Sequence, residues 1–114
     1  MKNEAKRQLR AAYEKRSVLG GVYAITNTVT GKMLVEATPS LASVRNRFEF
    51  AQTSGLTVWP KLQKDWNKYG SGSFAFEVLE ELEKGETQSA REFATDLKLL
   101  KEMWLNRGRS SGFY

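Results

Sequence analysis

Two short segments near the start of the chain, residues 21–27 and 32–38, are separated by only four residues. Side chains in the first segment alternate between two sets, and β-branched residues are frequent in it, which is typical of a strand. In the connection, Gly31 suits a left-handed turn position and Asn27 can hydrogen-bond its local backbone. The pattern therefore predicts a short β-hairpin.

Helical spacing follows the hairpin. Pro39 and Ser40 open a segment from 40 to about 53, in which Ser40 can act as the N-cap and Gly55 ends the helix. One side of this segment carries apolar residues at helical intervals. They are Leu41, Val44, Phe48 and Ala51. The spacing predicts a helix that packs this side against the domain.

A second helix is expected from Pro60, a residue that is well suited to the first helical position. Its apolar face is formed by Leu62, Trp66 and Tyr69, and another face by Lys61, Lys64 and Lys68. We interpret the aromatic stripe as core rather than as a platform for stacking bases. The three lysines fit either a solvated face or a set of phosphate contacts.

The remaining segments complete an order of helix, two strands, two helices, strand and helix. A basic helix is expected over 2–16, a strand over 74–82 and a long helix over 87–106, followed by a loosely ordered tail, 107–114. Phe113 in the tail, together with the final tyrosine, could fold back onto the domain. We therefore predict an α+β fold with a small three-stranded antiparallel sheet flanked by helices.

Length and composition limit the classes of function. The 114 residues fit a single domain, with a core spanning 20–106. Cysteine and histidine are both absent, which excludes disulfides, thiolate catalysis, the usual zinc sites and histidine acid–base catalysis. The sequence contains neither an apolar run long enough for a membrane span nor the apolar centre of a signal peptide. We expect a cytoplasmic protein with no membrane partner.

The net charge of +5 is unevenly distributed. Residues 1–16 carry six basic and two acidic side chains, and residues 40–70 carry five and two, whereas residues 76–103 carry four basic and eight acidic ones. The first two thirds of the chain therefore favour an anionic partner such as nucleic acid, and the last third opposes one.

Several spaced motifs lie within this order of elements. They are Gly21-Val22-Tyr23, Gly31-Lys32, Asn46-Arg47-Phe48, LQKDWNKYG at 62–70, FAFEVLEEL at 74–82 and DLKLLKEMWL at 96–105. As a set they resemble the GIY-YIG nuclease family, and in particular a phage- and bacteria-associated branch with a basic leading helix. The resemblance covers residues 20–106.

The resemblance implies metal-assisted phosphodiester hydrolysis. In that family, tyrosines from the first two strands and an arginine from the first helix surround the phosphate, a histidine or tyrosine assists, and a glutamate of the last helix holds a divalent cation. A carboxylate is a hard ligand suited to Mg²⁺, and an arginine fork suits phosphoryl oxygens. Only Tyr23 retains its family residue at these positions. The other positions are occupied by Leu34, Glu36, Val44, Phe48 and Lys101.

These replacements leave three functions open. The first is a nuclease-like domain that is inactive or severely weakened, binds no cofactor and retains nucleic-acid binding. Its phosphate contacts would be Arg45, Arg47, Lys61, Lys64 and Lys68.

The second is an active, Mg²⁺- or Mn²⁺-dependent DNA endonuclease with rearranged residues. Its phosphate contact would be Arg45 after a shift of helix register, and its carboxylate would be Glu36, Glu92 or Glu102. The third is a protein-interaction module, in which Leu34, Val44 and Phe48 form an apolar docking surface or else close the groove by joining the core.

Overall fold

The structure is a computed structural model, and it describes residues 19–108 and 112–114. In chain order the elements are β1 (Leu19–Asn27), β2 (Met33–Thr38), α2 (Leu41–Ser54), the 3-10 turn η1 (Pro60–Leu62), α3 (Gln63–Tyr69), the 3-10 turn η2 (Ser71–Ser73), β3 (Phe74–Glu83) and α4 (Ala90–Asn106). From β1 onward this is the predicted order. The expected helix over 2–16 lies outside the described residues.

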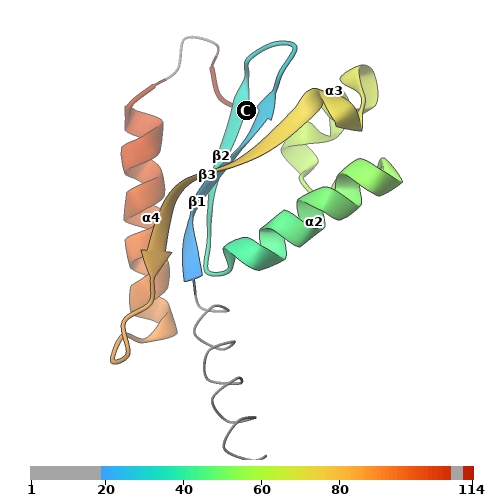
Figure 1. Ribbon diagram of the computed structural model, residues 1–114. Coiled ribbons are helices and arrows are strands. Elements are labelled where there is room, and N and C mark those ends of the chain that lie inside the picture. Colours follow the sequence, from blue (N-terminus) through green and yellow to red (C-terminus); the bar gives the residue numbers. More distant parts are fainter. Residues whose placement is uncertain (1–18, 109–111) are drawn as a thin grey trace, which may run out of the picture.

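The three strands form one antiparallel sheet in the order β2-β1-β3 (Figure 1). Tyr23 of β1 faces Glu36 of β2, and Ile25 faces Leu34. On the other side β1 pairs with the whole of β3, so the predicted strand over 74–82 is an edge strand of this sheet. The predicted α+β class with a small antiparallel sheet is confirmed.

The helices cover the two faces of the sheet separately. Figure 1 shows α2 and α3 on one side and α4 on the other. The core on the α2 side is larger and rich in aromatic residues, and it includes Leu62 and Trp66 of the second helical segment. The core on the α4 side is built on Val22 and Ala24 of β1, against which Trp104 packs. Because side chains alternate along a strand, β1 supplies both cores and directs Tyr23 toward α2.

The hairpin turn forms as the sequence predicts. The Oδ1 atom of Asn27 accepts hydrogen bonds from the backbone N–H groups of Val29 and Thr30, at 3.0 and 3.4 Å. Gly31 has a φ of 80°, the left-handed conformation that glycine adopts without steric cost. Asn27 is fully buried, so these bonds replace the water that its side chain loses on folding.

Caps define the ends of the helices. Ser40 caps α2 by accepting from the N–H of Ser43, and Gly55 ends the helix with a φ of 78°, both as predicted. The last helix begins at Ala90 rather than at residue 87, because Ser89 and Glu92 form a reciprocal capping box. The second helical segment also differs from the prediction, since its first turn, η1, is a 3-10 turn. Within the described residues, no helix has the length and apolar character that a membrane span needs.

The end of the chain is ordered against the sheet. The prediction of a loose tail over 107–114 is therefore wrong for its last residues, and the alternative that Phe113 and the final tyrosine fold back onto the domain is confirmed. The backbone N–H of Tyr114 donates to the carbonyl of Met33 at 3.0 Å, and the N–H of Met33 donates to the carbonyl of Gly112 at 3.2 Å. The Tyr114 hydroxyl donates to Asp65 at 2.7 Å and accepts from the Asn27 amide at 3.0 Å. The terminus therefore extends the sheet beside β2 and ties the hairpin to α3.

Candidate functional site

Tyr23, the residue that the resemblance retains, lies in the core beneath α2. Its side chain is only 5% exposed. Its ring stacks on Phe76 of β3 with the centroids 5.5 Å apart. The indole Nε1–H of Trp59 donates a hydrogen bond to the Tyr23 hydroxyl at 3.2 Å. The oxygen of this hydroxyl thus already accepts a hydrogen bond from the protein.

The surroundings of Tyr23 also keep its hydroxyl protonated. Burial is the main cause that raises its pKa above the ordinary value of 10.0, and the charge of Glu36 acts in the same direction. The hydrogen bond from Trp59 and the charge of Arg47 oppose this rise but do not cancel it. Because burial disfavours the phenolate, Tyr23 is poorly placed to accept a proton near neutral pH.

Leu34, Val44 and Phe48 fill the space in which the resemblance implies polar catalytic groups. All three are buried, and Phe48 is 4% exposed. The Phe48 ring lies 5.6 Å from the ring of Phe76 and 6.2 Å from that of Trp66, centroid to centroid. These residues belong to the aromatic core, so they form no apolar docking surface, and the alternative that they close the groove is the correct one.

Glu36 and Lys101 meet between β2 and α4. The Lys101 ammonium donates to a Glu36 carboxylate oxygen at 3.0 Å, and the two side chains are 31% and 30% exposed, in the order Glu36 and Lys101. The structure thus pairs two positions that the sequence identified separately. The resemblance had indicated Glu36 as the replacement of a motif glycine and Lys101 as the replacement of a metal-binding glutamate.

The pair of Glu36 and Lys101 does not fit a divalent cation. The Glu36 carboxylate, which a metal ion would need as a ligand, is already paired with the positive charge of Lys101. Of the other candidate carboxylates, Glu92 accepts from the backbone N–H of Ser89 in the capping box, and Glu102 is exposed. Across residues 19–108 and 112–114, no three acidic side chains gather into a possible metal-binding group.

Arg45 and Arg47 are both exposed on α2 but point to different sides of the helix, since two residues correspond to about 200° of rotation. The Arg45 guanidinium lies over the Phe76 ring, 5.5 Å from its centroid. It borders a shallow cavity of about 280 Å³ between α2 and β3. Arg47 is close enough to Tyr23 for its charge to lower the pKa of that tyrosine. The two arginines therefore do not line one groove.

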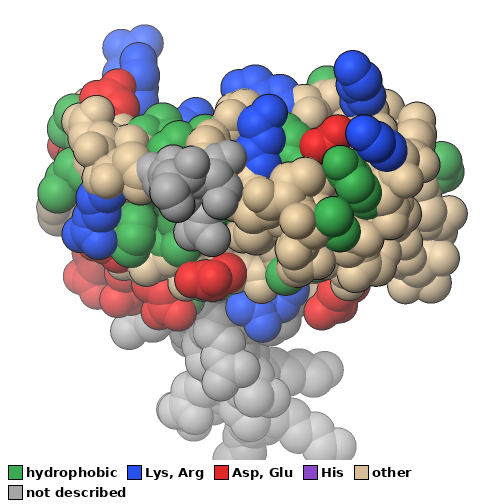
Figure 2. All heavy atoms as spheres, turned by 90° about the horizontal axis from the view of Figure 1, so that it is seen from above, with side chains coloured by type: hydrophobic (Ala, Val, Ile, Leu, Met, Phe, Trp, Pro, Cys, Tyr) green, Lys and Arg blue, Asp and Glu red, His purple; other side chains and the backbone are tan. Residues whose placement is uncertain are grey.

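The three lysines of the second helical segment are all exposed. Lys61, Lys64 and Lys68 lie on the side away from the buried Leu62 and Trp66. In the space-filling view, several basic side chains stand along the upper edge and the largest group of acidic ones lies toward the lower left, but both halves also carry side chains of the opposite charge (Figure 2). The charge is thus only partly separated on this face.

Trp59 is the site residue that sequence reasoning missed. It lies in the loop between α2 and η1, a stretch without helical or strand periodicity. Its partner Tyr23 is 36 positions away in the chain. The only local signal is the Pro60 that follows it, which marks a helix start and says nothing about a tertiary contact.

Solved structures with this arrangement of elements are known. The chain is similar to the catalytic domain of homing endonuclease I-TevI, with a TM-score of 0.57 and 23% sequence identity over 77% of this chain and 86% of that one. The chain has the GIY-YIG fold. A mutant of the catalytic domain of intron endonuclease I-TevI gives a TM-score of 0.55 and 22% identity, over 78% of this chain and 82% of that one.

No protein-family model and no curated protein matches the sequence. The resemblance that the sequence indicated is thus supported at the level of the GIY-YIG fold. A fold alone does not determine chemistry, which depends on the side chains at the site. At this site they are a buried tyrosine, an aromatic core and an ion pair.

Proposed function

We propose that this chain is a nuclease-fold domain that binds nucleic acid without cutting it. The observation that carries the proposal is the ion pair between Lys101 and Glu36, 3.0 Å long. Two unit charges of equal sign 4 Å apart repel by about 4 kcal/mol near a protein surface, before screening by salt. Because a divalent cation carries two charges, one placed beside Glu36 would meet about twice that repulsion from the Lys101 ammonium.

The burial of the former catalytic face supports the same proposal. The Tyr23 side chain is only 5% exposed and its hydroxyl accepts a hydrogen bond from Trp59, and Phe48 fills the neighbouring space within the core. Cleavage also requires a group that takes a proton and a cation that offsets the developing charge. Tyr23 is kept protonated, and the Lys101 ammonium beside Glu36 has none of the open coordination sites of a metal.

The exposed basic side chains support the binding half of the proposal. Lys61, Lys64 and Lys68 share the outer side of the segment that contains α3, and the chain has a net charge of +5. Lysines make phosphate contacts that do not depend on sequence, and each such contact releases counterions from the nucleic acid. We expect weak, salt-sensitive binding of duplex DNA through these lysines.

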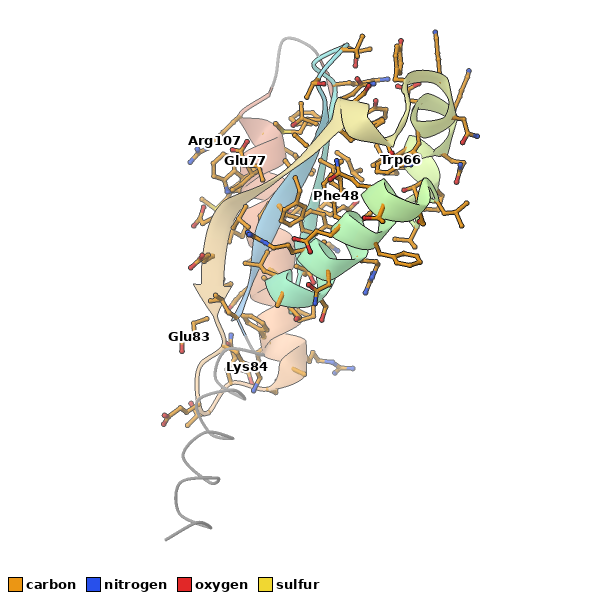
Figure 3. All side chains as sticks on the ribbon, turned by 45° about the vertical axis from the view of Figure 1, so that its right-hand side comes forward. Phe48, Trp66, Glu77, Glu83, Lys84 and Arg107 are labelled. Carbon is orange, nitrogen blue, oxygen red and sulfur yellow. The ribbon has the colours of Figure 1, made fainter. Side chains whose placement is uncertain are left out.

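A gel-shift titration at several salt concentrations tests this surface. Replacing the three lysines by glutamine should weaken binding. It should also reduce the magnitude of the slope of log affinity against log salt concentration by about 0.9 for each lost phosphate contact. The matched control replaces Lys84, Arg91 and Lys98 by glutamine. In Figure 3, Lys84 lies at the end of the molecule opposite to Trp66 of α3.

The control variant should retain the slope of log affinity against log salt concentration that the unmodified protein shows. The nucleic-acid proposal fails if the unmodified protein gives no shift at low salt, or if the α3 variant and the control lose affinity equally. Neither result bears on the absence of cleavage, which needs its own assay.

A further inference from the structure

A second site lies on the opposite face of the sheet, beyond the C-terminal end of α4. A cavity of about 590 Å³ is bounded there by the sheet, by the last turn of α4 and by the end of the chain. Its floor includes Met33, Val35 and Leu79. This volume is within the range of small-molecule sites, and a mainly apolar lining with few polar groups is typical of them.

The aromatic walls of this cavity are held in place. The indole Nε1–H of Trp104 donates to the Glu80 carboxylate at 2.9 Å, which fixes the plane of that ring. Phe113 forms the other wall, and the backbone hydrogen bonds between Met33 and the two residues that flank Phe113 hold it beside the sheet. Two positioned aromatic residues favour a ligand with a flat apolar body.

Two opposite charges line the same cavity. The Arg107 guanidinium stacks on Trp104, with its central carbon 4.1 Å from the ring centroid. Stacking leaves the N–H donors at the edge of the guanidinium available. Glu77 of β3 supplies a carboxylate, and Figure 3 shows Glu77 and Arg107 at the same end of the molecule. Among the described residues, neither side chain belongs to an ion pair within 4.0 Å.

We infer that this cavity binds a small zwitterion with an aromatic side chain, of the class of a free aromatic amino acid. The ligand's carboxylate pairs with Arg107, its ammonium pairs with Glu77, and its ring lies between Trp104 and Phe113. Both charged partners are exposed, so the expected affinity is modest. The site is separate from Tyr23, which points to the other face of the sheet, and it does not depend on nucleic-acid binding.

Calorimetric titration of the full chain with L-phenylalanine tests the inference, and the indole resonance of Trp104 reports the location of binding. Two analogues test the charges separately. N-acetyl-L-phenylalanine lacks the ammonium and L-phenylalanine amide lacks the carboxylate, and each should bind about five- to tenfold more weakly than the amino acid.

Charge-neutralising variants assign each contact. Arg107→Gln should weaken the amino acid and its N-acetyl form about five- to tenfold and leave the amide unaffected, while Glu77→Gln should weaken the amino acid and the amide only. The control variants Arg91→Gln and Glu86→Gln remove exposed charges that do not line the cavity. The absence of saturable binding at millimolar L-phenylalanine overturns the inference, as does an affinity that neither cavity variant changes.

Discussion

Replacing Phe48 by alanine tests whether core packing closes the groove that the resemblance implies beneath α2. The Phe48 side chain is 4% exposed, and its ring is within 6.3 Å of the rings of Trp59, Trp66 and Phe76, centroid to centroid. The substitution removes a whole aromatic ring from a packed cluster and leaves a cavity behind. Substitutions of this kind cost about 3–5 kcal/mol of folding free energy.

For a domain of this size, each 1 kcal/mol lowers the Tm by roughly 3–5 °C, so Phe48→Ala should lower it by roughly 10–25 °C. The assay is urea denaturation followed by circular dichroism, with a thermal melt on the same samples. Phe50 provides a matched control on the same helix, because it is 63% exposed. Phe50→Ala should change the free energy of unfolding by less than about 0.5 kcal/mol.

The comparison of these two variants is what could refute the packing argument. If Phe48→Ala costs less than about 1 kcal/mol, or no more than Phe50→Ala, the Phe48 ring is not part of a packed core in solution. The groove would then be open, and the reasons for assigning no catalytic role to this face would no longer hold.

Three further predictions concern the terminus, the tyrosines and the ion pair. Tyr114→Phe should lower the free energy of unfolding, measured by urea denaturation, by about 1–3 kcal/mol, because it removes the hydroxyl that accepts a hydrogen bond from the fully buried Asn27 amide. A loss below about 0.5 kcal/mol would contradict a stabilising role of this hydrogen bond. Burial raises the pKa of both Tyr23 and Tyr114 above 10.0. The contribution of these tyrosines to the free energy of unfolding should therefore be fully present below pH 10 and be lost as the pH rises through their folded-state pKa values. Thermal melts at increasing pH check this, and a free energy of unfolding that does not change across that range would contradict the burial of the two hydroxyls. Lys101→Met should cost less than about 1 kcal/mol, because Glu36 remains solvated; a larger loss in denaturation would show that the pair is a main support of the fold.

The sequence predicted those features that are determined by neighbouring residues. The hairpin followed from Asn27 and Gly31, whose side-chain chemistry and backbone freedom act within one turn. The boundaries of α2 followed from Ser40 and Gly55, which satisfy the ends of that helix. Local signals of this kind can be read without knowing what the element packs against.

The contacts that define the site could not be predicted in this way. Trp59 bonds to Tyr23 and Tyr114 reaches Asp65, and in both cases a segment without periodicity meets a distant element. Such contacts depend on how the layers come together, which no local pattern encodes. Lys101 was recognised only as a replacement of a family residue, and its pairing with Glu36 required the structure.

We propose that this domain does not cut DNA, and a plasmid assay tests this proposal most directly. Purified protein comprising residues 1–114 is incubated with supercoiled plasmid in Mg²⁺ or Mn²⁺, and the relaxed and linear forms are quantified over time. We predict no conversion above the rate without protein. Reproducible cutting that disappears in the Tyr23→Phe variant would contradict the account, since it would show that the buried hydroxyl still acts on phosphodiesters.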